Sequence, residues 1–277
     1  MTQDSWVLTE GDGPVVAIAL HDGHDVREDV AALFAITEMD RWREEDPFTV
    51  TWTTVGDTRI VVKRSRFELD MNRPRDKAVY LEPEDAWGLT VWQTKPSPEI
   101  IARSLAEYDA FYATVRRVFT DLEHRFGRFV VYDVHTYNHR RLGLQALPAD
   151  PSYNPEINLG TGRLNRKYWA PVLDRFLTDL REFDFLGRRL DVRENIRFRG
   201  GHFSHWVHQT FPQSACVLSI EVKKFFMDEW SNDPDLTSLD AIRRALESTV
   251  PGVLEALKPV QGESDRCKNY PIELTEV

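Results

Sequence analysis

The chain has 277 residues, 42% hydrophobic and 29% charged, and this composition predicts a single large α/β domain over residues 1–277. Its formal net charge of -10, without any basic block, argues against a surface that follows nucleic-acid phosphates. The N-terminus lacks a secretory signal pattern, and no apolar run is long enough to span a membrane. We therefore expect a cytoplasmic protein without nucleic-acid or membrane partners, in which Cys216 and Cys267 stay free thiols.

The first predicted elements are two strands and the loops that follow them. Residues 14–20 form a continuous apolar run, typical of a strand that is covered on both faces. From Asp25 the apolar spacing becomes helical, which leaves residues 21–24 as a strand-to-helix loop. Residues 59–63 are the second strand and lead into an arginine-rich loop over 64–74.

A long helix is predicted next, with Ser97 before it, Pro98 at its first position and Gly127 at its end. The later elements are a strand at 129–133, a turn-rich loop at 153–162, a helix at 169–185, a strand at 216–222 and a helix at 239–257 with a break at Pro251. This alternation predicts a three-layer αβα domain around a mixed, mostly parallel sheet.

Three residues with side chains suited to catalysis or metal binding occupy equivalent positions in this pattern. His21, His135 and Glu221 each stand at the C-terminal end of a predicted strand. Open α/β sheets place their ligand crevice at that edge. We therefore expect these side chains to lie at one site.

The histidines of this set indicate a metal site. His21 and His24 are three residues apart around Gly23, which permits a tight bend, so both imidazoles can reach one cation. Two loop histidines in ordinary hydrogen bonds are the structural alternative. His135 favours the metal, because a third histidine completes the three-ligand set of a catalytic zinc site with one open position.

Two carboxylates near these histidines each have more than one interpretation. Asp133 precedes His135 by two positions on the same strand face, so it can orient that imidazole, or else cap a helix or pair with Arg140. Glu221 ends the most apolar strand, where an unpaired carboxylate is costly. Its partner is either metal-bound water or a cation such as Lys223.

Two further segments have features of substrate binding. Residues 70–75 carry guanidinium donors suited to a carboxylate, although a solvated charge cluster is the common alternative. Residues 197–202 contain paired glycines, which suit a mobile substrate loop or a plain turn. The remaining histidines are expected to be surface or structural: His124, His139, His205 and His208.

Six blocks of the sequence, in order, resemble the N-formylglutamate amidohydrolase family. They are HDGH, DMNRPRD, DVHTYNHR, NLGTG, RGGHF and SIEVKKFFMDEW, and the similarity spans most of the chain. Their order is also similar to zinc carboxypeptidases, with H-x-x-[EH], an Asn-Arg pair, H-[ST]-Y and a glutamate that ends a strand. The resemblance implies a zinc-carboxypeptidase-like (phosphorylase/hydrolase-like) fold.

The resemblance also implies a role for each residue that matches the pattern. It implies one zinc ion on His21, His24 and His135. Zinc carboxypeptidases carry Glu where this chain has His24, and the acids that could replace it as second ligand are Asp22, Asp25 and Glu28.

The implied substrate is a small anionic molecule. Asn72 and Arg73 would bind its carboxylate, and Glu221 would be the general base. Arg64 or Arg66 would stabilise the oxyanion, with His202 in the substrate loop.

The implied reaction is hydrolysis of an N-acyl amino acid, with N-formyl-L-glutamate giving formate and L-glutamate as the leading case. A zinc peptidase or deacylase with another substrate is one alternative. A catalytically silent carboxylate-binding protein of the same fold is the other.

Overall fold

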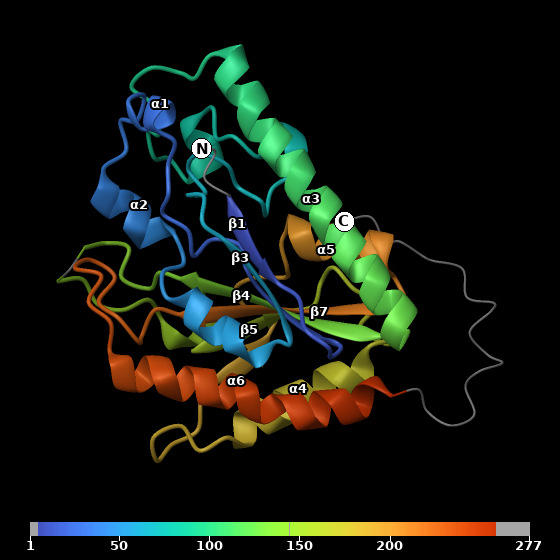
Figure 1. Ribbon diagram of the computed structural model, residues 1–277. Helices are drawn as coiled ribbons and strands as arrows, with labels where there is room; N and C mark the ends of the chain where they lie inside the picture. Colours follow the sequence, from blue (N-terminus) through green and yellow to red (C-terminus); the bar gives the residue numbers. More distant parts are fainter. Residues whose placement is uncertain (1–4, 144, 259–277) are drawn as a thin grey trace.

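The computed structural model describes residues 5–143 and 145–258, and one seven-stranded sheet forms its centre (Figure 1). The strands in chain order are β1 (Trp6–Thr9), β2 (Val15–Ala19), β3 (Thr58–Val62), β4 (Phe129–Tyr137), β5 (Ile157–Gly160), β6 (Val192–Glu194) and β7 (Ala215–Lys223). Their order across the sheet is β1-β3-β2-β4-β7-β5-β6. The central four, β3, β2, β4 and β7, are parallel, while β1 and β5 run antiparallel to their neighbours β3 and β7.

Helices cover both faces of this sheet. The α-helices are α1 (Glu28–Ala31), α2 (Glu38–Glu44), α3 (Pro98–Phe126), α4 (Ala170–Glu182), α5 (His202–Thr210) and α6 (Leu236–Leu257). Short 3₁₀ helices are η1 (Thr49–Val55), η2 (Arg75–Lys77), η3 (Pro83–Ala86) and η4 (Pro151–Tyr153). Helices α3 and α5 lie on one face, and α4 and α6 lie on the other (Figure 1). The predicted three-layer αβα architecture with a mixed sheet is confirmed.

The two faces of β4 differ in polarity, and this difference determines where the polar side chains of the sheet gather. Val130, Tyr132 and Val134 alternate into the core beneath α4 and α6. On the opposite face the strand begins with Phe129 and Val131 in the α3 core, then changes to Asp133 and His135. Strand β7 makes the same change on that face, from Val217 to Ser219 and Glu221. On the face covered by α3, strands β4 and β7 are therefore apolar where they begin and polar near their C-terminal ends.

Several predicted boundaries agree with the structure. Helix α3 begins after Ser97, whose hydroxyl caps the Ile100 N–H, and ends at Gly127 in a left-handed conformation. Strand β4 continues to Tyr137, four residues beyond its predicted end, because the ladder with β7 extends through His135 and Glu221.

Other local predictions were wrong. The helix expected from Asp25 is one turn, α1, and the loop expected at 153–162 contains β5. The break expected at Pro251 does not occur: α6 continues through it, because Gly252 and Val253 are buried in the packing with α4. Cys267 lies outside the described residues, and Cys216 is a buried free thiol. No helix in the described part of the chain has the length and apolarity of a membrane span.

A buried asparagine on β5 fixes the segment that precedes α5. The Asn158 side chain is fully buried, and its Oδ1 accepts the backbone N–H groups of Ile196 (2.9 Å) and Arg197 (2.8 Å). Its Nδ2 donates to the carbonyl of Phe198 at 2.9 Å. Buried polar groups are costly to leave unpaired, so these bonds hold residues 196–198 against the sheet.

We predict that Asn158→Ala lowers the free energy of unfolding by about 1–3 kcal/mol, because it leaves buried backbone groups without partners. The control is Asn165→Ala, which removes one exposed bond to the Tyr168 N–H and should cost no more than about 1 kcal/mol. Urea denaturation of both variants measures the difference. Equal losses would contradict this role of Asn158.

Candidate functional site

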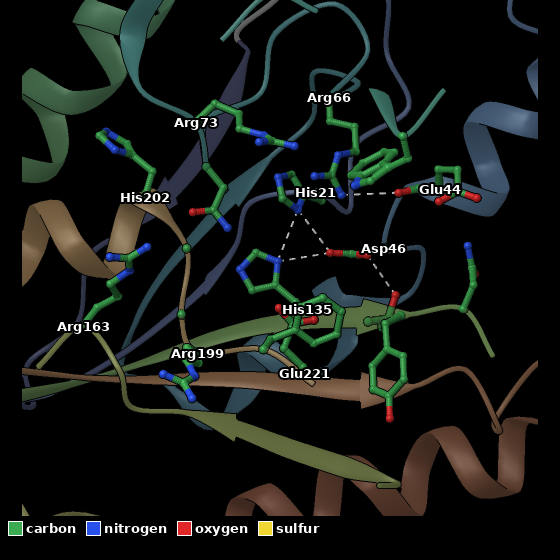
Figure 2. A pocket seen from close by; sticks show the side chains of 18 of the residues that line it. His21, Glu44, Asp46, Arg66, Arg73, His135, Arg163, Arg199, His202 and Glu221 are labelled. Carbon is green, nitrogen blue, oxygen red and sulfur yellow. Dashed lines mark hydrogen bonds and ion pairs between the residues drawn. The ribbon is translucent and has the colours of Figure 1, made fainter. Parts of the chain in front are cut away.

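A cavity of about 510 Å³ opens at the C-terminal edge of the parallel strands (Figure 2). Most of the residues that line it have polar or charged side chains, including His21, Glu44, Asp46, Arg66, Asn72, Arg73, His135, Arg163, Arg199, His202 and Glu221. The expected gathering of the three strand-end residues is therefore present, since His21, His135 and Glu221 all reach this cavity.

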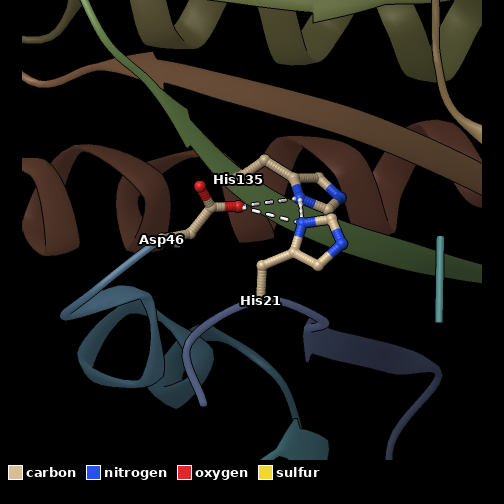
Figure 3. Close-up of side chains that lie close together, drawn as sticks. All are labelled: His21, Asp46 and His135. Atoms are coloured by element: carbon tan, nitrogen blue, oxygen red, sulfur yellow. Dashed lines mark hydrogen bonds and ion pairs between the residues drawn. The ribbon is translucent and has the colours of Figure 1, made fainter. Parts of the chain in front are cut away.

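Three buried side chains converge at the floor of the cavity (Figure 3). The Oδ2 atom of Asp46 lies 3.2 Å from His21 Nδ1 and 3.1 Å from His135 Nδ1. The two Nδ1 atoms are 3.2 Å apart. Asp46, which the sequence analysis did not propose, thus completes a group of three potential metal ligands.

The far side of each imidazole faces a carboxylate. His21 Nε2 lies 2.8 Å from Asp70 Oδ1, and His135 Nε2 lies 2.9 Å from Asp133 Oδ1. An ionised carboxylate can only accept, so each Nε2 donates its proton there. In the neutral rings both Nδ1 atoms then carry lone pairs, and these face Asp46 Oδ2. Three acceptors this close repel one another unless a cation or a proton lies between them.

The spacing fits a small tetrahedral metal ion. Zinc binds nitrogen and oxygen at about 2.0–2.2 Å, which places the ligand atoms of a tetrahedral site about 3.3–3.6 Å apart. The observed separations of 3.1–3.2 Å are slightly shorter and would widen by a few tenths of an ångström. Histidine held by a carboxylate through its other nitrogen is the usual arrangement of a metal ligand.

The buried network around Asp70 keeps that carboxylate ionised. Asp70 accepts bonds from Arg66 Nη2 (2.9 Å), the Asn72 N–H (2.7 Å) and the Tyr80 hydroxyl. Burial by itself would raise the pKa of Asp70, but His21 and Arg66 outweigh it and hold the pKa well below its usual value. The ring of His21 is thereby fixed in orientation.

The segment that carries Asp46 is held from two directions. Its backbone N–H donates to the His21 carbonyl at 2.9 Å, and its Oδ1 accepts from Thr136 Oγ1 at 2.9 Å. Lys224, which is buried directly after β7, donates to the carbonyls of Arg43 (2.5 Å) and Glu45 (2.8 Å). The only signal in the sequence was three successive acids before Pro47, a pattern that is usually solvated.

His24 lies outside this group. Its Nδ1 is 2.5 Å from Glu45 Oε2, its Nε2 is 3.1 Å from Arg41 Nη2, and its ring packs against Trp42. These contacts with residues of α2 and the position after it hold the His24 ring away from His21.

The acids weighed as substitutes for His24 are not in the group of three either. Asp22 accepts the Val50 N–H (2.8 Å) and the Thr49 hydroxyl (3.3 Å), which ties the loop to η1. Asp25 forms a backbone bridge with Arg64, and Glu28 begins α1.

Glu221 lies beside His135 in the sheet register and faces the cavity. It forms no ion pair among the described residues, and Lys223 instead donates to the Asn154 carbonyl at 3.0 Å. Burial raises the pKa of Glu221 to about 8, an effect that the nearby His135 partly opposes. A cation in the adjacent group would favour its ionised form.

The predicted substrate residues divide between the cavity and its surroundings. Asn72, Arg73, Arg66 and His202 line the cavity. Arg64 does not: it is buried in an ion cluster with Glu68 and Glu107.

His202, the first residue of α5, has its Nε2 3.2 Å from the Tyr108 hydroxyl. Burial lowers its pKa. Asn72 Oδ1 accepts the backbone N–H of Phe203 at 2.9 Å, so the Asn72 segment is fixed to the start of this helix.

Comparison with known proteins agrees with the sequence resemblance. A structure of N-formylglutamate amidohydrolase from Ralstonia eutropha JMP134 superposes with a TM-score of 0.70 at 16% identity, covering 92% of this chain and 98% of that one. A gene product of Agrobacterium tumefaciens gives a TM-score of 0.66 at 18% identity, with coverages of 92% and 95%. No curated protein matches the chain. The model of the N-formylglutamate amidohydrolase family matches residues 13–227, so the chain belongs to that family.

Proposed function

We propose that the protein is a zinc-dependent amide hydrolase that converts N-formyl-L-glutamate to formate and L-glutamate. The observation that carries the proposal is the convergence of His21 Nδ1, Asp46 Oδ2 and His135 Nδ1 beside Glu221. Membership of the N-formylglutamate amidohydrolase family supports the substrate.

His21, Asp46 and His135 would hold the zinc ion. Two neutral imidazoles and one carboxylate form a common ligand set for catalytic zinc, with a further position left for water or substrate. Bound zinc supplies Lewis-acid polarisation of an amide carbonyl and lowers the pKa of water. Asp70 and Asp133 orient the two imidazoles through the Nε2 protons.

Glu221 is the group that moves protons. It pairs with His135 in the sheet register and lines the same cavity, which supports its carboxylate as the group that takes a proton from the attacking water. The same carboxyl then returns the proton to the nitrogen of the leaving amine as the carbon–nitrogen bond breaks. No lysine or arginine pairs with Glu221 among the described residues, which leaves it free for this exchange.

The cationic residues bind and stabilise charge. Arg73 and Asn72 would hold a substrate carboxylate, since the Arg73 side chain is 38% exposed and its polar contacts within the protein are long, 3.9 Å from Nε to Asp70 Oδ2 and 3.3 Å from Nη2 to the Asp85 carbonyl. Arg66 lies next to His21 through their common partner Asp70 and would stabilise the oxyanion formed from the formyl group.

We expect the protein to bind one zinc ion per chain, with Asp46 and not His24 as the third ligand. Asp46→Asn should weaken zinc binding by more than about 100-fold, because loss of even an indirect partner of a metal ligand costs 10–100-fold. His24→Gln is the matched control and should retain zinc. Isothermal titration of chelator-treated protein measures both. Loss of zinc in His24→Gln with full binding in Asp46→Asn would reverse the assignment.

Glu221→Gln should lower kcat by at least about 10²-fold, since the shape is kept but the proton acceptor is lost. Zinc content and melting temperature should not change. Glu194→Gln is the control, because Glu194 ends β6 outside the cavity and pairs with Arg166. A fully active, zinc-replete Glu221→Gln protein would rule out this mechanism.

Arg73→Ala should raise KM for N-formyl-L-glutamate by about 10–100-fold, the usual value of a charge-assisted contact. Arg73→Lys should restore part of the loss, because lysine keeps the charge but not the forked geometry. Arg75→Ala is the control, since Arg75 pairs with Asp109 away from the cavity. Equal KM values in all variants would show that residues 70–75 are a solvated charge cluster with no part in substrate binding.

A further inference from the structure

We infer that Arg163 and Arg199 form a second anion-binding point in the cavity, which selects N-acyl amino acids with two carboxylates over those with one. This inference rests on the proposed function and adds to it the residues that would bind the second carboxylate. Its basis is that these two guanidinium groups lack the protein partners that other cations of the cavity have.

Three of the six lysines and arginines that line the cavity already have close partners. They are Arg66, which pairs with Asp70 at 2.9 Å, Arg141, which pairs with Glu44 at 3.0 Å, and Lys224, which donates to two backbone carbonyls. Their charges are balanced or their donors used within the protein. Arg66 keeps the role proposed for it at the oxyanion, but none of the three is free to bind a second substrate carboxylate.

Arg163 and Arg199 are different. Neither guanidinium forms an ion pair or a side-chain hydrogen bond within residues 5–143 and 145–258, although both line the cavity. Figure 2 shows the two on the same side of the cavity as Arg73 and His202, with Glu44 and Asp46 on the other side. The free positive charge of the site is thus concentrated on one wall.

The backbone beneath the two arginines is closely packed. The Gly162 N–H donates to the Arg199 carbonyl at 2.8 Å, and a Cβ on Gly160 would lie 2.5 Å from Gly200 N. Gly200 has a φ of +101°, a conformation that favours glycine. Asn158 holds the preceding residues 196–198, so both arginines project from a fixed base rather than from free loops.

The packed backbone that carries the two arginines contacts the segment of Asn72 and Arg73, which would hold the first carboxylate. A Cβ on Gly201 would lie 2.4 Å from Asn72 Oδ1, and that oxygen accepts the Phe203 N–H. Arg73, on one side of this contact, and the Arg163–Arg199 pair, on the other, therefore belong to one continuous wall. An amino acid with an acidic side chain presents two carboxylates at a separation of a few bonds, which suits two such points.

The selectivity follows from charge-assisted hydrogen bonding. A second carboxylate gains bidentate contacts with a guanidinium, whereas a neutral amide of the same size offers one acceptor and no charge. A site built to bind a polar group discriminates strongly against an analogue that lacks it. We therefore expect at least about 10-fold preference for N-formyl-L-glutamate over N-formyl-L-glutamine in kcat/KM.

The test is the double variant Arg163→Gln/Arg199→Gln. It should lower kcat/KM for N-formyl-L-glutamate by at least about 10-fold and reduce the glutamate-to-glutamine preference to a few-fold. The control is Arg197→Gln, an arginine on the same segment that contacts Phe198 and does not line the cavity. Its preference should match that of the unmodified protein.

A binding measurement separates this inference from the proposed hydrolysis. Calorimetric titration of the zinc-loaded protein with glutarate and with butyrate needs no turnover, and glutarate should bind more tightly only while both arginines are present. If glutarate binding depends on them but no formyl amino acid is hydrolysed, the inference stands and the proposed function fails. If N-formyl-L-glutamate is hydrolysed but the double variant keeps the full preference and glutarate affinity, the inference is overturned.

Discussion

The placement of two protons governs the chemistry of the site. Asp70 and Asp133 accept hydrogen bonds from the Nε2–H groups of His21 and His135, so in the neutral rings the opposite nitrogens present lone pairs to Asp46 Oδ2. Were either acid replaced by a hydrogen-bond donor, the ring could adopt the other tautomer and turn a proton toward the centre. The potential ligand set is therefore defined by residues that do not themselves belong to it.

The charged groups of the cavity are divided between two sides. Acids and histidines gather where the sheet ends, while unpaired guanidinium groups occupy the opposite wall (Figure 2). Burial of Glu221 beside His135 favours its protonated form, and a nearby cation favours ionisation, so its state depends on what the neighbouring group holds. Under the proposed function, this arrangement would let one cavity bind an anionic substrate without neutralising Glu221.

The fold and several residues of the cavity could be predicted from the sequence, because they follow from local patterns. Strand-end histidines and the Ser97 to Gly127 helix follow local rules of periodicity and capping, and these were predicted correctly. Asp46 was missed because its position depends on contacts with Thr136 and with a segment held by Lys224, which local patterns do not encode. The H-x-x-H spacing suggested His24, but contacts with Glu45, Arg41 and Trp42, which are distant in sequence, hold that ring elsewhere.

The three ligand atoms come from parts of the chain that meet only after folding. His21 and His135 are 114 residues apart, and Asp46 joins them through a loop anchored on β7. An unfolded chain would bind a metal weakly at such scattered groups, so zinc, if it is the ligand as proposed, would stabilise the native state over the unfolded one. At a free concentration of 100 times Kd, such linkage adds about 2.7 kcal/mol to stability. Without the ion a proton can occupy its place: burial alone would lower the pKa of His135, but Asp133 and Asp46 hold that pKa well above its usual value, so a cation would bind in exchange for the proton.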